Sequence, residues 1–143
     1  MTVHARVTRE PLSVHRLADM VGRPAAGAIV TFQGTTREVE RLDYEAYVEM
    51  AEARIGAIVA EAIQRHGLEA AAAEHRVGAV PLGESSVVVA TSAAHREEAF
   101  AGAREIIDRV KAEAPIWKKE VDAGATRWVE GKQATGPQEH VRP

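Results

Sequence analysis

The sequence contains no cysteine. This absence excludes disulfide bonds, cysteine-ligated zinc, iron–sulfur clusters and thiol nucleophiles, so any sulfur chemistry needs a sulfur atom carried by another molecule. No apolar run approaches the ~18 residues of a membrane span. The opening stretch, MTVHARVTREPLSVHRL, is interrupted by charged side chains too often to contain the apolar part of a signal peptide. We therefore expect a cytoplasmic protein.

Several motifs that would identify an active site are also missing. The chain has no GxGxxG or P-loop, no HExxH and no Gly-x-Ser-x-Gly nucleophile elbow, and it shows no internal repeat. Its six histidines are scattered without the spacing of metal ligands, at positions 4, 15, 66, 75, 95 and 140. We expect neither a metal site nor a resident cofactor.

What remains is the composition of an ordinary soluble domain. The chain has 143 residues, of which 45% are hydrophobic and 27% charged, enough to form a core of its own. The net charge of -3 gives no reason to expect nucleic acid or an anionic membrane as a partner, so any affinity for anions must be local. We predict one domain over residues 1–130, followed by a flexible tail over 131–143 that shows no periodicity.

Lysine is used unusually. The chain has 14 arginines but only four lysines, and Lys111, Lys118 and Lys119 lie within nine residues. Burial can bring the pKa of lysine toward neutrality, whereas arginine stays charged. A solvated basic patch explains the clustering equally well at this point.

Periodicity predicts an α+β fold with a mixed sheet, because neighbouring strands often follow one another directly in the sequence. Residues 3–8 suggest an edge strand, and the apolar run 27–34 a buried central strand. We expect Phe100 on the core face of the last helix. The alanine run Ala70–Ala73 could extend either neighbouring element, so we assign it to neither. Further strands are predicted at 42–48, 75–80, 87–91, 116–121 and 126–129, and helices at about 13–21, 50–66 and 95–114.

Four segments carry polar residues that the fold does not require. Gly34–Arg37 follows a strand, and its arginine can hold an anion. Thr91–Arg96 runs into the start of a helix, where free backbone N–H groups favour an anion. Lys111 lies in the last turn of that helix. In residues 115–120, strand alternation places either Lys118 or Lys119 on a largely apolar face, which makes that lysine a candidate acid, base or nucleophile.

Together these segments resemble the large, catalytic subunit of molybdopterin synthase. The resemblance extends over roughly residues 27–130 and is carried by GAIVTFQGTTR (27–37), LDYEAYVEMAE (42–52), HRVGAVPLGE (75–84), TSAAHREEAF (91–100) and KAEAPIWKKE (111–120). It implies an α/β-hammerhead fold with a mixed sheet, two main helices and one short N-terminal helix. It also implies a sulfurtransferase of molybdenum cofactor biosynthesis, which takes sulfur from the C-terminal Gly-Gly thiocarboxylate of a ubiquitin-like small subunit. The substrate would be cyclic pyranopterin monophosphate, converted to the dithiolene of molybdopterin by a homodimer within a heterotetramer.

The same resemblance implies roles for individual residues. Lys111 and Lys118 match the two essential lysines of the family. The residues that match its substrate-binding positions are Arg37, His95, Arg96, Lys119 and Glu120, with Lys132 as the available basic residue near the C-terminus. A module that only binds a ubiquitin-like tail or a phosphate is the alternative, and it would need the pocket but not both lysines. A generic acyl- or phosphate-handling enzyme lacks a nucleophile motif.

Overall fold

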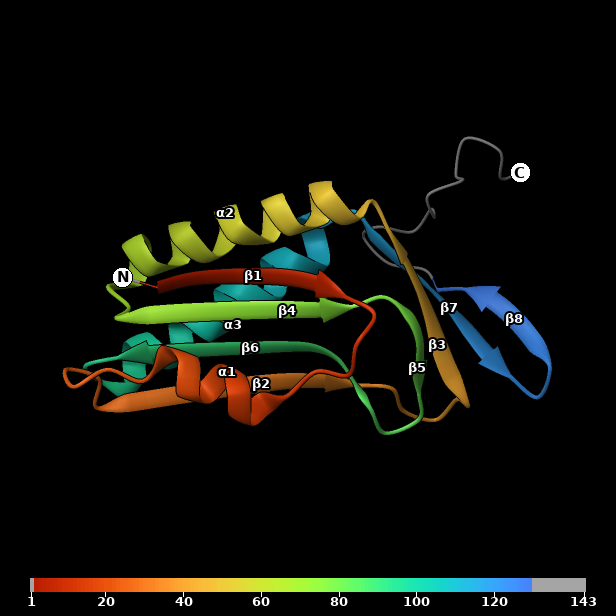
Figure 1. The fold of residues 1–143 in the computed structure, drawn as a ribbon, viewed down its shortest axis with the longest axis horizontal. Helices are drawn as coiled ribbons and strands as arrows, with labels where there is room; N and C mark the ends of the chain where they lie inside the picture. The colour runs from red at the N-terminus through yellow and green to blue at the C-terminus, as the bar shows by residue number, and fades with distance from the viewer. Residues whose placement is uncertain (1, 130–143) are drawn as a thin grey trace.

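The computed structural model describes residues 2–129, which form three helices and eight strands (Figure 1). The helices are α1 (Val14–Val21), α2 (Val48–His66) and α3 (Arg96–Glu113). The strands are β1 (Thr2–Thr8), β2 (Ala28–Thr35), β3 (Arg41–Ala46), β4 (Ala70–Arg76), β5 (Gly78–Pro81), β6 (Ser85–Ala93), β7 (Ile116–Asp122) and β8 (Ala125–Trp128). The predicted α+β class, with two main helices and a short N-terminal one, is confirmed.

The strands form two sheets that meet at one end of the molecule. The first sheet has the order β1-β4-β6-β2 and is mixed, because β1 and β4 are parallel while the other pairs are antiparallel. The second sheet, β5-β3-β7-β8, is antiparallel. Its strands run steeply across the end of the first sheet at which β4 finishes (Figure 1). This junction positions the residues discussed below.

Helices cover both faces of the first sheet, as Figure 1 shows with α1 in front of the strands and α3 behind them. The larger core lies on the α2 and α3 side and the smaller core under α1. The alanine run at 70–73, for which the sequence predicts no element, lies between the two cores. Ala71 and Ala73 face the larger core, and Ala70 and Ala72 face the smaller one. A buried strand has no polar face, so alternation could not reveal it.

Three other expectations need correction. Strand β2 is an edge strand in this sheet order, and Ile29 on it is 48% exposed, so the run at 27–34 is not a central strand. The strand expected at 75–80 is divided at Gly78, whose φ of +86° lets β4 end and β5 join the other sheet. Phe100 is 62% exposed, because Ala99, one position earlier, faces the core instead.

A buried carboxylate fastens α1 to the first sheet. Glu74 of β4 is fully buried on the α1 side and accepts hydrogen bonds from His4 of β1 and from Arg16 of α1. Burial alone would raise the pKa of Glu74, but the hydrogen bonds from His4 and Arg16 hold it below its ordinary value. The carboxylate is therefore charged at neutral pH and links three elements.

The predicted tail at 131–143, the end of the predicted domain at residue 130, and Lys132 lie outside the described residues. Among the helices that the structure describes, none is long and apolar enough to cross a membrane.

The segment after β2 is held by one buried hydroxyl. Thr36 is 1% exposed and its Oγ1 donates to the Val80 carbonyl at 3.1 Å. We expect Thr36→Val to lower the free energy of unfolding by about 1–2 kcal/mol, the cost of leaving a buried carbonyl unpaired. The exposed neighbour provides the control, since Thr35→Val should change it by less than about 0.5 kcal/mol. Urea unfolding measures both, and equal effects would contradict this role of Thr36.

Candidate functional site

Lys118 lies on the core-facing side of β7. The register pairs it with Tyr44 of β3, which is 8% exposed, and alternation places Ile116 and Glu120 on the same face. Burial lowers the pKa of Lys118, and the charges of Lys111 and Arg37 lower it further against the opposing effect of Glu120. The sequence left open which of the two lysines lies on the core-facing side, and the register with β3 shows that it is Lys118.

Lys111 reaches the same place from α3. The helix ends at Glu113, and the following Pro115 cannot continue it, so Lys111 occupies the last turn. A cation is favoured there by the helix dipole. Its charge acts on both Lys118 and the buried ring of His75. Two lysines from different elements are therefore close enough for their charges to interact where the two sheets join.

Arg37 follows the end of β2. Besides the Thr36 hydroxyl, two backbone hydrogen bonds hold the segment: Thr36 N–H donates to the Glu84 carbonyl at 3.0 Å and Gly83 N–H to the Thr36 carbonyl at 2.8 Å. Arg37 itself is exposed, and its charge acts on Lys118. Glu38 has a φ of +69°, a left-handed conformation that turns the chain directly after Arg37.

Lys111, Lys118 and Arg37 form what we call the lysine cluster. Two residues beside it, His75 and Tyr44, were not expected from sequence. His75 is 8% exposed at the end of β4, and its ring meets that of Tyr44 edge to face, with centroids 5.0 Å apart. Burial lowers the pKa of His75 to about 4, with the charges of Lys111 and Lys118 acting in the same direction. The only sequence signal for the contact between His75 and Tyr44 was the alternation of apolar and polar residues in the strand predicted at 42–48, which put Tyr44 on a buried face.

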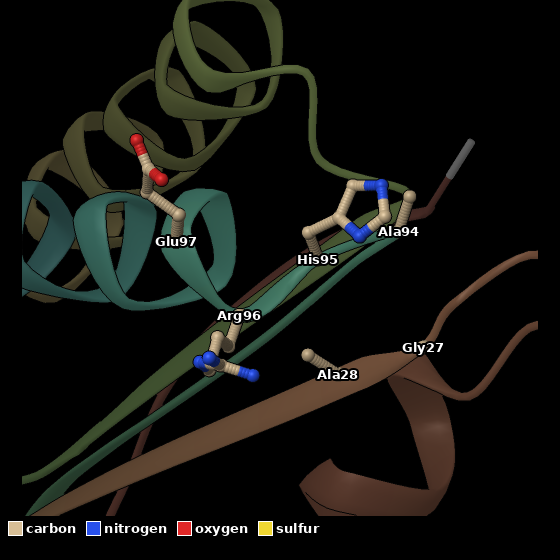
Figure 2. A pocket seen from close by; sticks show the side chains of 6 residues that line it. All are labelled: Gly27, Ala28, Ala94, His95, Arg96 and Glu97. Carbon is tan, nitrogen blue, oxygen red and sulfur yellow. The ribbon is translucent and has the colours of Figure 1, made fainter.

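His95 and Arg96 lie elsewhere, at the start of α3. They line a pocket of about 440 Å³ together with Gly27, Ala28, Ala94 and Glu97. Figure 2 shows the Arg96 side chain directed toward the strand that carries Ala28, while the carboxylate of Glu97 points away. His95 is the N-cap residue of α3 but makes no side-chain capping bond, so its imidazole does not cap the start of the helix. An anion in this pocket would meet two side chains and the helix start.

The neighbouring backbone keeps this pocket in shape. Gly27 N–H donates to the Ala93 carbonyl at 3.0 Å, and a Cβ at Gly27 would lie 2.4 Å from the Ala94 carbonyl oxygen. A larger residue than glycine would push β2 away from β6 here. The Thr91 hydroxyl donates to the Ala99 carbonyl at 2.7 Å and fixes the end of β6 against α3.

Within one chain, Arg37 lies apart from His95 and Arg96. Arg96 and Lys111 lie at opposite ends of α3, about 22 Å apart along its axis. Arg37 and the Arg96 pocket lie at opposite ends of β2, separated by about 24 Å. One copy of the chain therefore has a lysine cluster at one end and a separate anion pocket at the other.

Lys119 and Glu120, the other two candidates predicted from sequence on β7, lie on opposite faces of that strand. Lys119 lies on the opposite face of β7, 3.8 Å from Glu45 and 5.2 Å above the ring of Trp128. Glu120 lies on the face of Lys118 and forms an ion pair with Arg127 of β8. Glu120 is thus placed beside the cluster, whereas Lys119 is not.

The lysine cluster suits chemistry on an anion that becomes more negative during reaction. Two ammonium groups and one guanidinium can stabilise developing negative charge. The lysine with the lowered pKa can also exchange a proton nearer neutral pH. No group of three His, Asp or Glu side chains within residues 2–129 could hold a metal ion.

Known proteins of similar sequence decide the family. The family profile described as MoaE protein matches residues 7–113. The chain belongs to this family. The matched range contains Arg37, His95, Arg96 and Lys111, while Lys118 lies beyond its end.

Relatives of this MoaE-family chain occur in plants and archaea. A molybdopterin synthase catalytic subunit of Oryza sativa subsp. indica is 48% identical over 128 residues, covering 85% of this chain and 66% of the relative. The protein of that name from Thermoplasma volcanium is 42% identical over 127 residues, covering 85% and 93%. The crystal structure of molybdopterin synthase from Staphylococcus aureus superimposes with a TM-score of 0.84 at 30% identity, covering 89% of this chain and 97% of that one. The chain thus spans just under two thirds of the rice protein and nearly all of the archaeal one.

The electrostatic coupling of the two lysines can be measured. Because the charge of Lys111 lowers the pKa of Lys118, we expect Lys111→Met to raise the pKa of Lys118 toward the 10.5 of an ordinary lysine. Arg104→Gln is the control, since Arg104 is an exposed cation on α3 paired with Asp108. NMR titration of the lysine side chains reports both, and an unchanged pKa in Lys111→Met would show that the two ammonium groups do not interact.

Proposed function

We propose that this chain is the catalytic subunit of a molybdopterin synthase. The observation that carries the proposal is the position of Lys118 opposite the buried Tyr44 at the junction of the two sheets, where the charges of Lys111 and Arg37 act on it, in a member of the MoaE family. The substrate would be cyclic pyranopterin monophosphate, and the product the dithiolene of molybdopterin. A cytoplasmic location belongs to the same proposal.

The sulfur would come from a second protein, since this chain has no cysteine. A ubiquitin-like small subunit with a C-terminal Gly-Gly thiocarboxylate fits the cluster, because its tail is narrow and ends in an anion that lysine can bind. Each transfer forms one carbon–sulfur bond on the pterin in place of one carbon–oxygen bond, whose oxygen leaves either with the phosphate or as water. A second water then cleaves the acyl–sulfur bond and leaves the tail as a carboxylate. Two transfers complete the dithiolene.

Lys111 and Lys118 have two tasks in this reaction. Their ammonium groups stabilise the thiocarboxylate and the oxyanion that forms at the tail carbonyl when water attacks. The lowered pKa of Lys118, caused mainly by burial, allows its amine to take up and return protons. The tail carboxylate formed by water attack is resonance-stabilised and does not take the sulfur back. Water attack therefore makes the sulfur transfer irreversible.

The anion pocket at the start of α3 enters the proposal through a second copy of the chain. Strand β2 is an edge of its sheet within the described residues, and Ile29 and Phe32 are exposed on it. Two such strands paired antiparallel across a twofold axis would place the start of one β2 beside the end of the other. His95 and Arg96 of one copy would then lie near Arg37 of its partner. A homodimer with two shared sites, each served by one small subunit, gives a heterotetramer.

The lysine roles predict a specific loss of turnover. We expect Lys111→Ala and Lys118→Ala each to lower sulfur transfer by at least 10²-fold, the usual range for a proton-transferring group. Both variants should keep the fold, since Lys111 is exposed and Lys118 is only half-buried. Arg104→Ala, which removes an exposed cation of α3, should retain wild-type turnover. The assay incubates each variant with thiocarboxylated small subunit and pterin precursor and detects the dithiolene by mass. Lost affinity with unchanged turnover would favour a module that only binds.

The shared site predicts complementation between two variants that each bind the precursor weakly. Arg37→Ala and Arg96→Ala should each weaken precursor binding by about 1.5–3 kcal/mol, the range for a hydrogen bond to a charged group. When the two variants are mixed and allowed to exchange subunits, one site of each mixed dimer has both arginines intact. About a quarter of wild-type activity should return.

Calorimetric titration of the precursor gives the affinities, and sedimentation of the wild-type chain checks that it is a dimer at micromolar concentration. If activity does not return on mixing although subunits exchange, each site lies within one chain.

A further inference from the structure

His75 is a buried titratable residue that the reaction proposed above does not use. It is 8% exposed at the end of β4, on the side of the first sheet that faces α2 and α3. Its partners in the neighbouring strands are Val7 of β1 and Val87 of β6. An imidazole with apolar neighbours on both sides has to find its polar partners above the sheet or in its own backbone.

The hydrogen bond of His75 determines its tautomer. Nδ1 lies 2.8 Å from the carbonyl oxygen of Arg76. A carbonyl oxygen only accepts hydrogen bonds, so the proton of the neutral ring is on Nδ1, and Nε2 carries a lone pair. The same bond fixes the ring orientation, because donor and acceptor belong to adjacent residues at the end of one strand.

The fixed ring supports Tyr44, and Tyr44 lies next to Lys118. The two aromatic rings meet edge to face with an interplanar angle of 70°, an arrangement that aromatic pairs favour. Tyr44 is directly opposite Lys118 in the β3–β7 register. Displacing His75 would remove the ring contact of Tyr44, leaving its side-chain hydrogen bond with Ser86, and would admit water beside Lys118.

Two positive charges act on His75 from neighbouring elements. Lys111 acts on it from α3 and Lys118 from β7. Arg37 adds a third positive charge beside Lys118, and Glu120 the opposing negative one. Tyr44 is uncharged, since burial raises its pKa. Burial lowers the pKa of His75 to about 4, so at neutral pH the ring adds no further positive charge.

We propose that His75 is a positioning residue of the lysine site: its neutral ring, oriented by the Arg76 carbonyl, holds Tyr44 against Lys118 and keeps water from the buried side of that lysine. The inference rests on the proposed role of Lys118 in sulfur transfer. It assigns no contact between His75 and the substrate.

Two variants separate this role from a chemical one. His75→Ala removes the ring, so water reaches Lys118, and we expect the pKa of Lys118 to rise by about one unit and kcat to fall about tenfold or more, with KM changed less than threefold. His75→Phe keeps an uncharged ring against Tyr44, and we expect it to restore the pKa of Lys118 to within about 0.3 units and kcat to within threefold of wild type. His66→Phe is the matched control, because His66 pairs with Glu105 at the far end of α2.

NMR titration of Lys118 is carried out on the free chain, and kcat and KM are measured with the small subunit and pterin precursor. Urea unfolding of each variant shows that the folded chain is being compared. An unchanged Lys118 pKa in His75→Ala would overturn the proposal. A folded His75→Phe chain that regains the lysine pKa but not kcat would also overturn it, since the imidazole nitrogens would then be needed for chemistry. Failure of wild-type protein to transfer sulfur would refute the proposed function alone, because the titration needs no substrate.

Discussion

The contact between Tyr44 and His75 joins the two sheets, and the lysine site depends on it. Tyr44 belongs to the second sheet and His75 to the first, and their rings meet edge to face at 5.0 Å. The connection is short because β4 passes into β5 through Gly78, whose left-handed φ turns the chain from one sheet to the other. The second sheet therefore crosses the end of the first at a set place, and β7 carries Lys118 close enough to Lys111 of α3 for their charges to interact.

Burial of positive charge at this junction opposes folding. Lys118 is half-buried among cations, and its lowered pKa means that the folded state disfavours the ammonium form relative to an exposed lysine. Between the lowered pKa and 10.5 the unfolded chain binds more protons, so stability rises with pH in that interval. An anionic ligand would relieve this repulsion, and the thiocarboxylate tail proposed above is such an anion. The apolar contacts of the two cores offset the cost in the free chain.

The length of α3 divides the cationic residues into two groups. An 18-residue helix separates Arg96 from Lys111 by about 22 Å, and β2 separates Arg37 from the same pocket by a similar distance. A phosphate-bearing pterin cannot bridge that span within one chain. A twofold axis at the open edge of β2 would bring the two ends together, and the exposed Ile29 and Phe32 give that edge an apolar surface to bury.

The sequence by itself determined the three helices and the strands at 116–121 and 126–129, because these follow from local periodicity and turn residues. The scarcity of lysine elsewhere singled out Lys111 and Lys118. Strand alternation correctly put Lys118 and Lys119 on opposite faces, since side chains alternate at every residue of a strand. Tertiary structure alone decided which strands are central: Ala70–Ala73 is buried on both faces, and β2 lies at an edge. It also decided that His75 is part of the site and that Arg96 is distant from Arg37. These facts depend on contacts between residues far apart in the chain, for which a single sequence carries no local signal.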